Sequence, residues 1–109
     1  MSDKPNLSVD AQVAALVPRY LANRAADVGR IRAALALGDF EAIRAAAHGM
    51  KGSGGGYGFS EISRLGAAME TGARARDAAT IVELVASLEA YLARIEVERD
   101  HGQGDPGSA

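Results

Sequence analysis

The chain has 109 residues, of which 48% are hydrophobic and 24% charged, and this balance predicts one small soluble globular domain. Its formal net charge of −2 gives no electrostatic reason to expect nucleic acid or an anionic membrane as a partner. The absence of cysteine excludes disulfides and thiolate metal sites, and no apolar run approaches the ~20 residues that cross a bilayer, so we expect a cytoplasmic protein.

The N-terminal third predicts a polar arm and two helices. Residues 1–7 are polar and contain a proline, so we expect a flexible arm without a secretory signal. Ser8 is a suitable N-cap for a short extra helix. Pro18 fits the first turn of the next helix, where an N–H is not needed, and Gly38 suits a left-handed C-terminal cap. The apolar residues of that second helix have helical spacing: Leu21, Ala25, Val28, Ile31 and Leu35.

Three further helices follow in the remaining sequence. Asp39, Ser60 and Asp77 are their expected N-caps. The first has an apolar face of Phe40, Ile43, Ala47 and Met50, joined by Gly54 and Tyr57 if the helix continues through the glycines. The second has Ile62, Leu65, Met69 and Ala73, and the third has Ile81, Leu84, Val85, Leu88, Leu92 and Ile95.

These elements predict an all-α fold. No segment alternates strictly between apolar and polar residues, so we expect no strand. The connections are short, which favours antiparallel neighbours. We therefore expect an antiparallel up-down four-helix bundle with a short extra N-terminal helix. The bundle domain should span residues 8–98, followed by a disordered polar tail at 99–109.

One histidine in the third predicted helix points away from the core. Each residue advances about 100° around a helix, which places His48 about 130° from the centre of the apolar face, on the solvent side. Gly52 and Gly55 share this side and present no side chain, while Arg44 and Lys51 flank the imidazole. A nucleophile, a cation and open space together suit a transferable phosphoryl group.

The residues around this histidine form a recognisable block. Ala47, His48, Gly49, Met50, Lys51, Gly52 and Ser53 are followed by three glycines, Tyr57 and Gly58. This block resembles the signature A-H-x-L-K-G-S-x-x-x-[LIV]-G of the histidine phosphotransfer (HPt) domain family of multistep two-component signalling. The Gly38–Asp39 and Met69–Glu70 pairs also resemble the family, and the similarity spans about residues 10 to 97.

The resemblance implies a role for each residue of the block. His48 would be phosphorylated through Nε2, Lys51 would orient and neutralise the phosphoryl group, and Gly52 would give the partner access to the ring. The docking surface would include Arg44, Gly49, Ser53 and Gly55. We expect the Ser53 hydroxyl to bond to backbone or to a helix end near the site.

The resemblance also implies partners. These would be the receiver domains of response regulators and hybrid histidine kinases, which exchange a phosphoryl group between their aspartates and the histidine. The receiver would supply Mg²⁺, so we expect no cofactor or metal on this chain. The chain would be a monomeric phosphocarrier without autokinase or ATP-binding activity.

The sequence departs from the family pattern at a few positions. Met50 replaces the usual leucine, which conserves volume. Gly49 stands where a hydroxyl residue is frequent, and Tyr57 stands where an aliphatic residue is usual. The added glycines leave open how far the helix extends, and Gly56 has no assigned role.

These residues allow other interpretations. The run K-G-S-G-G-G lacks the strand and the G-K-[ST] order of a Walker phosphate-binding loop. A metal site is disfavoured, because the other histidine, His101, falls in the expected tail. Glu70 is either a general base or, more simply, a solvated or ion-paired helix residue, and the family resemblance also allows it to pack near, or pair with, a basic group by the helix of His48. The main alternative function is a non-catalytic helical scaffold or dimerisation module, which explains the apolar faces but not the residues around His48.

Overall fold

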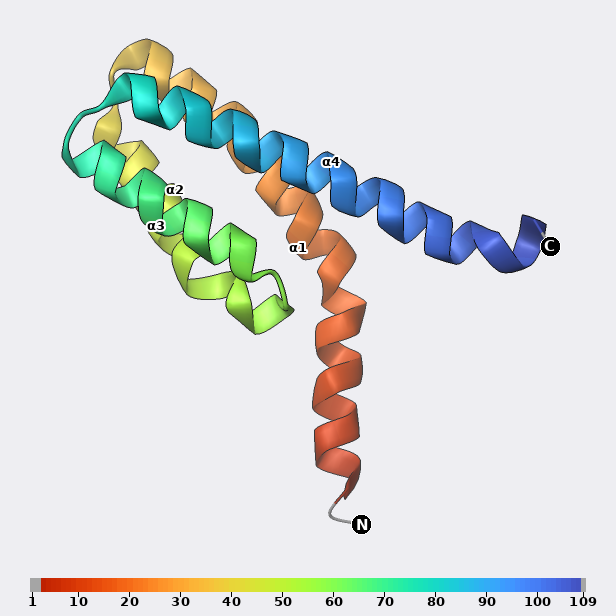
Figure 1. Ribbon diagram of the computed structural model, residues 1–109. Coiled ribbons are helices and arrows are strands. Elements are labelled where there is room, and N and C mark those ends of the chain that lie inside the picture. Colours follow the sequence, from red (N-terminus) through yellow and green to blue (C-terminus); the bar gives the residue numbers. More distant parts are fainter. Residues whose placement is uncertain (1–2, 109) are drawn as a thin grey trace.

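The structure is a computed structural model that describes the backbone of residues 3–108 and the side chains of residues 11–99. Its elements are α1 (Asp3–Leu37), α2 (Phe40–Ser53), the 3₁₀ turn η1 (Gly55–Tyr57), α3 (Ser60–Arg74) and α4 (Ala78–Ser108), as shown in Figure 1. No strand occurs within residues 3–108, which confirms the all-α prediction.

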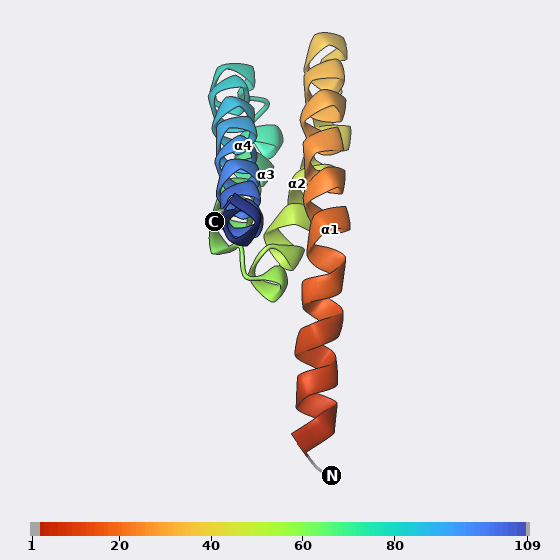
Figure 2. The same cartoon turned by 90° about the vertical axis from the view of Figure 1, so that its right-hand side faces the viewer.

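The four helices form a closed ring of antiparallel neighbours. Each helix packs against the next one in the chain, and α4 returns to pack against α1 (Figures 1 and 2). Beyond this contact the first half of α1 and the last turns of α4 point away from each other (Figure 1). The predicted up-down four-helix bundle is therefore confirmed.

The prediction of a separate short N-terminal helix is wrong. The helix α1 runs without interruption through Pro18, so one long helix replaces the two expected there. A proline inside a helix removes one backbone hydrogen bond but does not necessarily end the helix. Val17 and Tyr20 on either side of Pro18 are buried, and this packing holds the helix together across the proline.

The predicted boundaries of the bundle domain stay predictions. The backbone of residues 3–7, expected as a flexible arm, continues α1, and the backbone of residues 99–108, expected as a tail, continues α4. Residues 1, 2 and 109 lie outside the described residues, as do the side chains of the outer turns of both helices.

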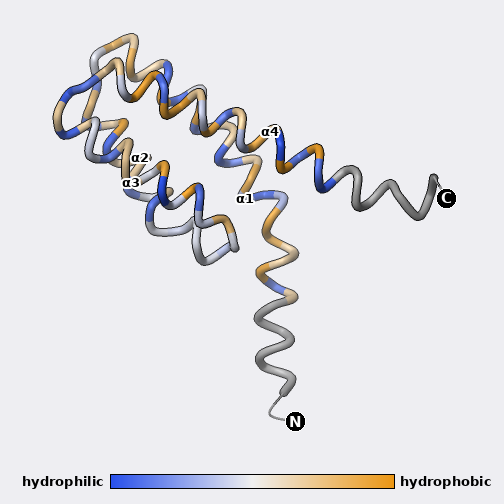
Figure 3. Tube along the Cα trace, in the orientation of Figure 1, coloured by the Kyte–Doolittle hydropathy of each residue, from blue (hydrophilic) through white to orange (hydrophobic). Residues whose placement is uncertain are grey.

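The core is built from the apolar faces that the sequence predicts. Apolar and polar residues recur in turn along the coloured parts of the helices (Figure 3), and the buried ones are almost all apolar. Burying such faces is the main favourable term in the stability of a small domain. The core cluster consists of Tyr20, Val28, Ile31, Ala34, Ile43, Ala47, Met50, Ile62, Leu65, Met69, Ala73, Ile81, Val85 and Leu88.

Two of the four predicted N-caps, Asp39 and Asp77, are confirmed, and Ser8 falls inside α1. The Ala42 N–H donates to Asp39 Oδ1 at 3.1 Å, and the Thr80 N–H donates to Asp77 Oδ1 at 3.2 Å. Gly38 adopts a left-handed φ of 70°, so α1 stops directly before the Asp39 cap. Ser60 is wrong as a cap, because it is already the first residue of α3 and Phe59 precedes it without a side-chain cap.

The glycine run ends α2 rather than extending it. The helix stops at Ser53, and a 3₁₀ turn leads to Gly58, whose φ of 89° redirects the chain into α3. Tyr57 of this turn stacks on the Tyr20 ring of α1, with ring centroids 4.1 Å apart. The Tyr20 hydroxyl also shares a 2.8 Å hydrogen bond with Ser53 Oγ. Tyr20 of α1 therefore contacts residues both before and after the glycine run, and these contacts hold the turn against α1.

A second glycine sets the distance between α2 and α3. A Cβ on Gly66 would lie 2.6 Å from the Lys51 backbone nitrogen and 2.8 Å from the Ala47 carbonyl oxygen. No side chain fits at such distances, so the backbones of the two helices meet here. Gly54 permits a similar approach to the Ser63 backbone nitrogen, which an added Cβ would meet at 2.6 Å.

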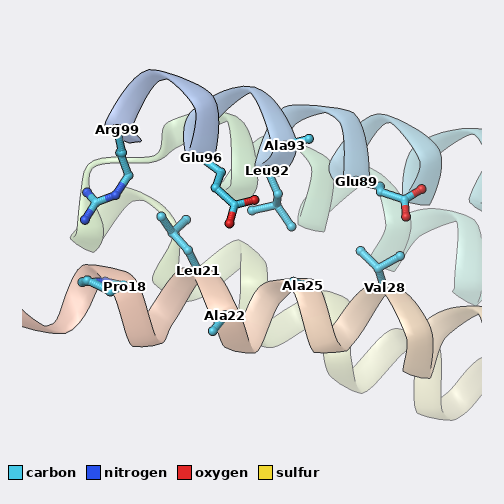
Figure 4. A pocket seen from close by; sticks show the side chains of 10 residues that line it. All are labelled: Pro18, Leu21, Ala22, Ala25, Val28, Glu89, Leu92, Ala93, Glu96 and Arg99. Atoms are coloured by element: carbon cyan, nitrogen blue, oxygen red, sulfur yellow. The ribbon is translucent and has the colours of Figure 1, made fainter. Parts of the chain in front are cut away.

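A groove of about 550 Å³ opens where α1 and α4 begin to diverge (Figure 4). Its apolar wall comes from Leu21, Val28 and Leu92, and Glu96 and Arg99 lie at one end. His48 is on α2 beside α3, so this groove is separate from the histidine.

Gly66→Ala should destabilise the fold. The new methyl group must push α2 and α3 apart, and overpacking of this kind costs about 1–3 kcal/mol. The matched control is Gly29→Ala on α1, where an added Cβ meets nothing within 4 Å. Relief of the glycine penalty should stabilise this control by about 0.5–1 kcal/mol. Urea unfolding measures both, and equal stability of the two variants would contradict the close helix contact.

Tyr20→Phe should lower the free energy of unfolding by about 1 kcal/mol, because it leaves Ser53 Oγ without its partner. Tyr57→Phe is the control, since the described structure gives the Tyr57 hydroxyl no hydrogen bond while its ring makes the same stack. Urea midpoints of the two variants test the difference, and an equal loss in both would assign the effect to the rings alone.

Candidate functional site

The candidate site is centred on His48 in the middle of α2. Its neighbours Ala47 and Met50 are buried in the core, which fixes the rotation of the helix. The His48 side chain is consequently 64% exposed, on the solvent side that the helical period predicts. An imidazole in this position is accessible to another molecule.

A buried carboxylate from α3 holds the inner edge of the imidazole. His48 Nδ1 lies 2.9 Å from Glu70 Oε2, although the Glu70 side chain is only 3% exposed. Lys51 Nζ donates to Glu70 Oε1 at 3.2 Å, and Arg74 Nη2 donates to Oε2 at 3.1 Å. One carboxylate therefore binds the histidine and two cations, and it joins α2 to α3 at the site.

The protonation of Glu70 decides the tautomer of the imidazole. Hydrogen bonds from His48 and then from Lys51 lower the pKa of Glu70, against the opposing effect of burial. The ionised carboxylate has no proton to donate, so Nδ1 must be the donor in the bond to Glu70. In the neutral ring the lone pair then lies on Nε2, the nitrogen opposite the carboxylate.

The predicted glycine face is open. An added Cβ at Gly49, Gly52 or Gly56 would meet nothing within 4 Å. At Gly55 it would meet only Ser63 Oγ at 3.8 Å, and the same hydroxyl accepts the Gly55 N–H at 2.9 Å. These four glycines therefore leave open surface beside His48.

The remaining predicted site residues have their own partners. Arg44, one turn before His48, forms a two-pronged ion pair with Glu41 on the exposed side of α2. Ser53 does not bond to backbone or to a helix end as expected, because its hydroxyl is used by Tyr20. Ser53 thus anchors the end of α2 rather than lining the imidazole.

Sequence reasoning gave Glu70 pairing with a basic group near the helix of His48 only as one alternative, and it gave Arg74 no definite role at the site. Glu70 is not solvated, but the ion-paired alternative is confirmed. Its position gave a signal, because Glu70 lies one turn after Gly66 on the face of α3 that is otherwise buried. An acid on a buried face needs partners, and Arg74 at i+4 is one of them.

Neither a metal cluster nor a membrane span is found in the described part of the chain. No group of three or more histidine, cysteine or acidic side chains there is arranged to hold an ion. No described helix combines the length and the apolar character needed to cross a bilayer.

Together, the bundle and the site define a helical module that presents one oriented histidine at its surface. The Hpt domain family model matches residues 15–98, and the chain belongs to this family. Hpt domains are histidine phosphotransfer domains of phosphorelays and interact there with receiver domains. Comparisons with curated proteins and with solved structures give no significant match.

The lowered pKa of Glu70 predicts a pH-dependent contribution to stability. A carboxyl whose pKa falls below its ordinary value of 4.5 on folding stabilises the fold above that pH. The contribution disappears as the pH falls through the folded-state pKa. The gap in unfolding free energy between the wild-type chain and Glu70→Gln should therefore be larger at pH 7 than at pH 3. Urea unfolding at both values measures it, and an equal gap would show that Glu70 is not held ionised.

Proposed function

We propose that this chain is a phosphocarrier that moves a phosphoryl group between receiver domains through His48. The observation that carries the proposal is the hydrogen bond between His48 Nδ1 and the buried Glu70 carboxylate on an otherwise exposed ring. It leaves Nε2 as the nucleophile and points that nitrogen away from the carboxylate.

The bonds made and broken in the transfer involve only His48 and the aspartates of the donor and acceptor receivers. The Nε2 lone pair attacks the phosphorus of an aspartyl phosphate on the donor receiver, and the P–O bond to that aspartate breaks. The electron pair of this bond returns to the aspartate carboxylate. In the second half the aspartate of another receiver attacks the phosphorus, and the electron pair of the N–P bond returns to Nε2.

Charge and shape around His48 support this assignment. Lys51 and Arg74 place two cations beside the ring, and both side chains are about half exposed or more. Both cations can also interact with an incoming phosphoryl group, because each makes only one hydrogen bond to Glu70 and has further N–H donors. The open surface at Gly49, Gly52 and Gly55 gives an aspartate-bearing active site room to approach, and Arg44 adds a charge at its edge.

The proposal includes the surroundings of the reaction. The partners are the receiver domains of hybrid histidine kinases and response regulators, and these supply the Mg²⁺. This chain acts as a monomer in the cytoplasm, binds no nucleotide and performs no autokinase reaction.

Incubation with a radiolabelled phospho-receiver and Mg²⁺ tests the assignment. We expect acid-labile label on the wild-type chain, because a phosphoramidate bond hydrolyses in acid, and no label on His48→Gln. Label that persists in His48→Gln, or label that resists acid, would refute the role of this histidine. A concentration-dependent oligomer with no transfer would instead favour the scaffold alternative.

Lys51→Ala should slow transfer from the phospho-receiver about tenfold while leaving the helical content unchanged, because one cation beside the phosphoryl group is lost. The matched control is Arg64→Gln, which removes one positive charge from the side of α3 turned away from α2. Rapid-quench transfer rates compare the two, and equal rates would remove Lys51 from the mechanism.

A further inference from the structure

The contact between Glu70 and His48 has a second consequence, which concerns the ring after it is phosphorylated. In the resting site the Nδ1–H donates to a carboxylate that is buried and ionised. Attack by Nε2 produces a phosphorylated ring that still bears the Nδ1 proton, which makes it an imidazolium. The carboxylate 2.9 Å away then faces a positive ring rather than a neutral one, and the hydrogen bond becomes charge-assisted.

The fate of this proton decides how reactive the phosphorylated ring is. If the proton stays, breakage of the N–P bond returns an electron pair to a cationic ring, which leaves as neutral imidazole. If the proton is lost, the same step must expel an imidazolate anion, which is a far poorer leaving group. The protonated form is therefore the labile one and the deprotonated form the long-lived one.

The charges around the ring favour the labile form. Glu70, Lys51 and Arg74 together carry one net positive charge. A phosphoryl dianion would reverse that sign, and an imidazolium proton restores neutrality. The other charged groups near Glu70 are Arg44 and Glu41 of α2, which form an ion pair with each other. Among the described side chains, no ion pair from α1 or α4 reaches Glu70.

We propose that Glu70 keeps the Nδ1 proton on the ring throughout the phosphoryl cycle and thereby holds phosphorylated His48 in its labile form. This inference rests on the proposed function, since it assumes that His48 is the residue that carries the phosphoryl group. Glu70 is a positioning residue, because it acts on the reaction only through the ring. It sets the lifetime of the phosphorylated chain and the ease of onward transfer.

The cycle is balanced without any proton transfer. Formation of the N–P bond consumes the Nε2 lone pair, and the donor aspartate keeps the electrons of the broken P–O bond. Departure of the phosphoryl group to the next aspartate, or to water in the side reaction, returns the electron pair to Nε2. The Nδ1 proton stays on its nitrogen, hydrogen-bonded to Glu70, in every state.

Chemical loading with phosphoramidate, a small phosphoryl donor that needs no receiver, provides the test. The decay of phosphorylated His48 is followed by ³¹P NMR from pH 5 to 9. In the wild-type chain fast decay should extend to higher pH than in Glu70→Gln, so that at pH 8 the variant decays about tenfold more slowly for a one-unit displacement of the profile. Glu61→Gln is the matched control on α3, because its carboxylate pairs with Arg64 instead, and its decay should equal that of the wild type.

A spectroscopic measurement addresses the same question within the wild-type chain. The ¹⁵N shift of Nδ1 in phosphorylated His48 at pH 8 should be that of a protonated nitrogen. An unprotonated Nδ1, or identical decay profiles in the wild type and Glu70→Gln, would overturn the inference. Should Glu70→Gln fail to fold, the ¹⁵N shift of the wild-type chain alone decides whether the proton is retained.

The outcomes also separate this inference from the proposed function. A chain that takes no label from any phospho-receiver but shows decay dependent on Glu70 refutes the proposed function alone. A chain that is labelled normally but decays independently of Glu70 refutes only the role of Glu70 in the phosphorylated state. Failure of phosphoramidate to modify His48 in the wild-type chain would also overturn that role.

Discussion

The backbone contact between α2 and α3 at Gly66 governs the geometry of the whole site. Because Gly66 has no side chain, α3 lies directly against the turn of α2 that runs from Ala47 to Lys51. Glu70 follows one turn later and is brought within hydrogen-bond distance of the His48 ring. A larger residue at position 66 would press against the backbone of α2, so the spacing that brings the carboxylate to the imidazole relies on this glycine.

This arrangement explains how an acid is tolerated at a buried position. An isolated ionised carboxylate in a core is strongly unfavourable, and it normally takes up a proton instead. Glu70 receives three donors from His48, Lys51 and Arg74, and its oxygens are satisfied. The Lys51 and Arg74 side chains are 49% and 63% exposed, so both cations keep contact with water while they bind the buried carboxylate. Glu70 is therefore a buried side chain whose three hydrogen-bond donors are all exposed.

The sequence was sufficient for features that depend on local geometry. The helical period alone places His48 on the solvent side, and the Asp39 and Asp77 caps follow from the affinity of short acids for free N–H groups. Glu70 was different, because two of its three partners, His48 and Lys51, belong to another helix and depend on a packing distance set by Gly66. The pattern of apolar residues within α3 does not reveal how close α2 lies. The partner of Ser53 was missed for the same reason, since Tyr20 is 33 residues away in the chain.

The errors at Pro18 and Ser60 have a related cause. Both rest on residue preferences of a few kcal/mol or less, and burial of neighbouring side chains is of similar size. At Pro18 the buried Val17 and Tyr20 continue the helix through a residue that usually begins one. At Ser60 the aromatic Phe59, packed against the core, takes the position before the helix. Tertiary packing decides where local preferences are weak.

The open glycine face of α2 and the buried acid of α3 divide the work of recognition and alignment between separate helices. Gly49 and Arg44 of α2 and Gly56 of η1 shape the surface that an approaching protein meets, and none of them contacts Glu70 through a hydrogen bond or an ion pair. The same division makes the outer face of α2 a natural place to redirect signalling by design, provided that Gly66 and Glu70 are left in place.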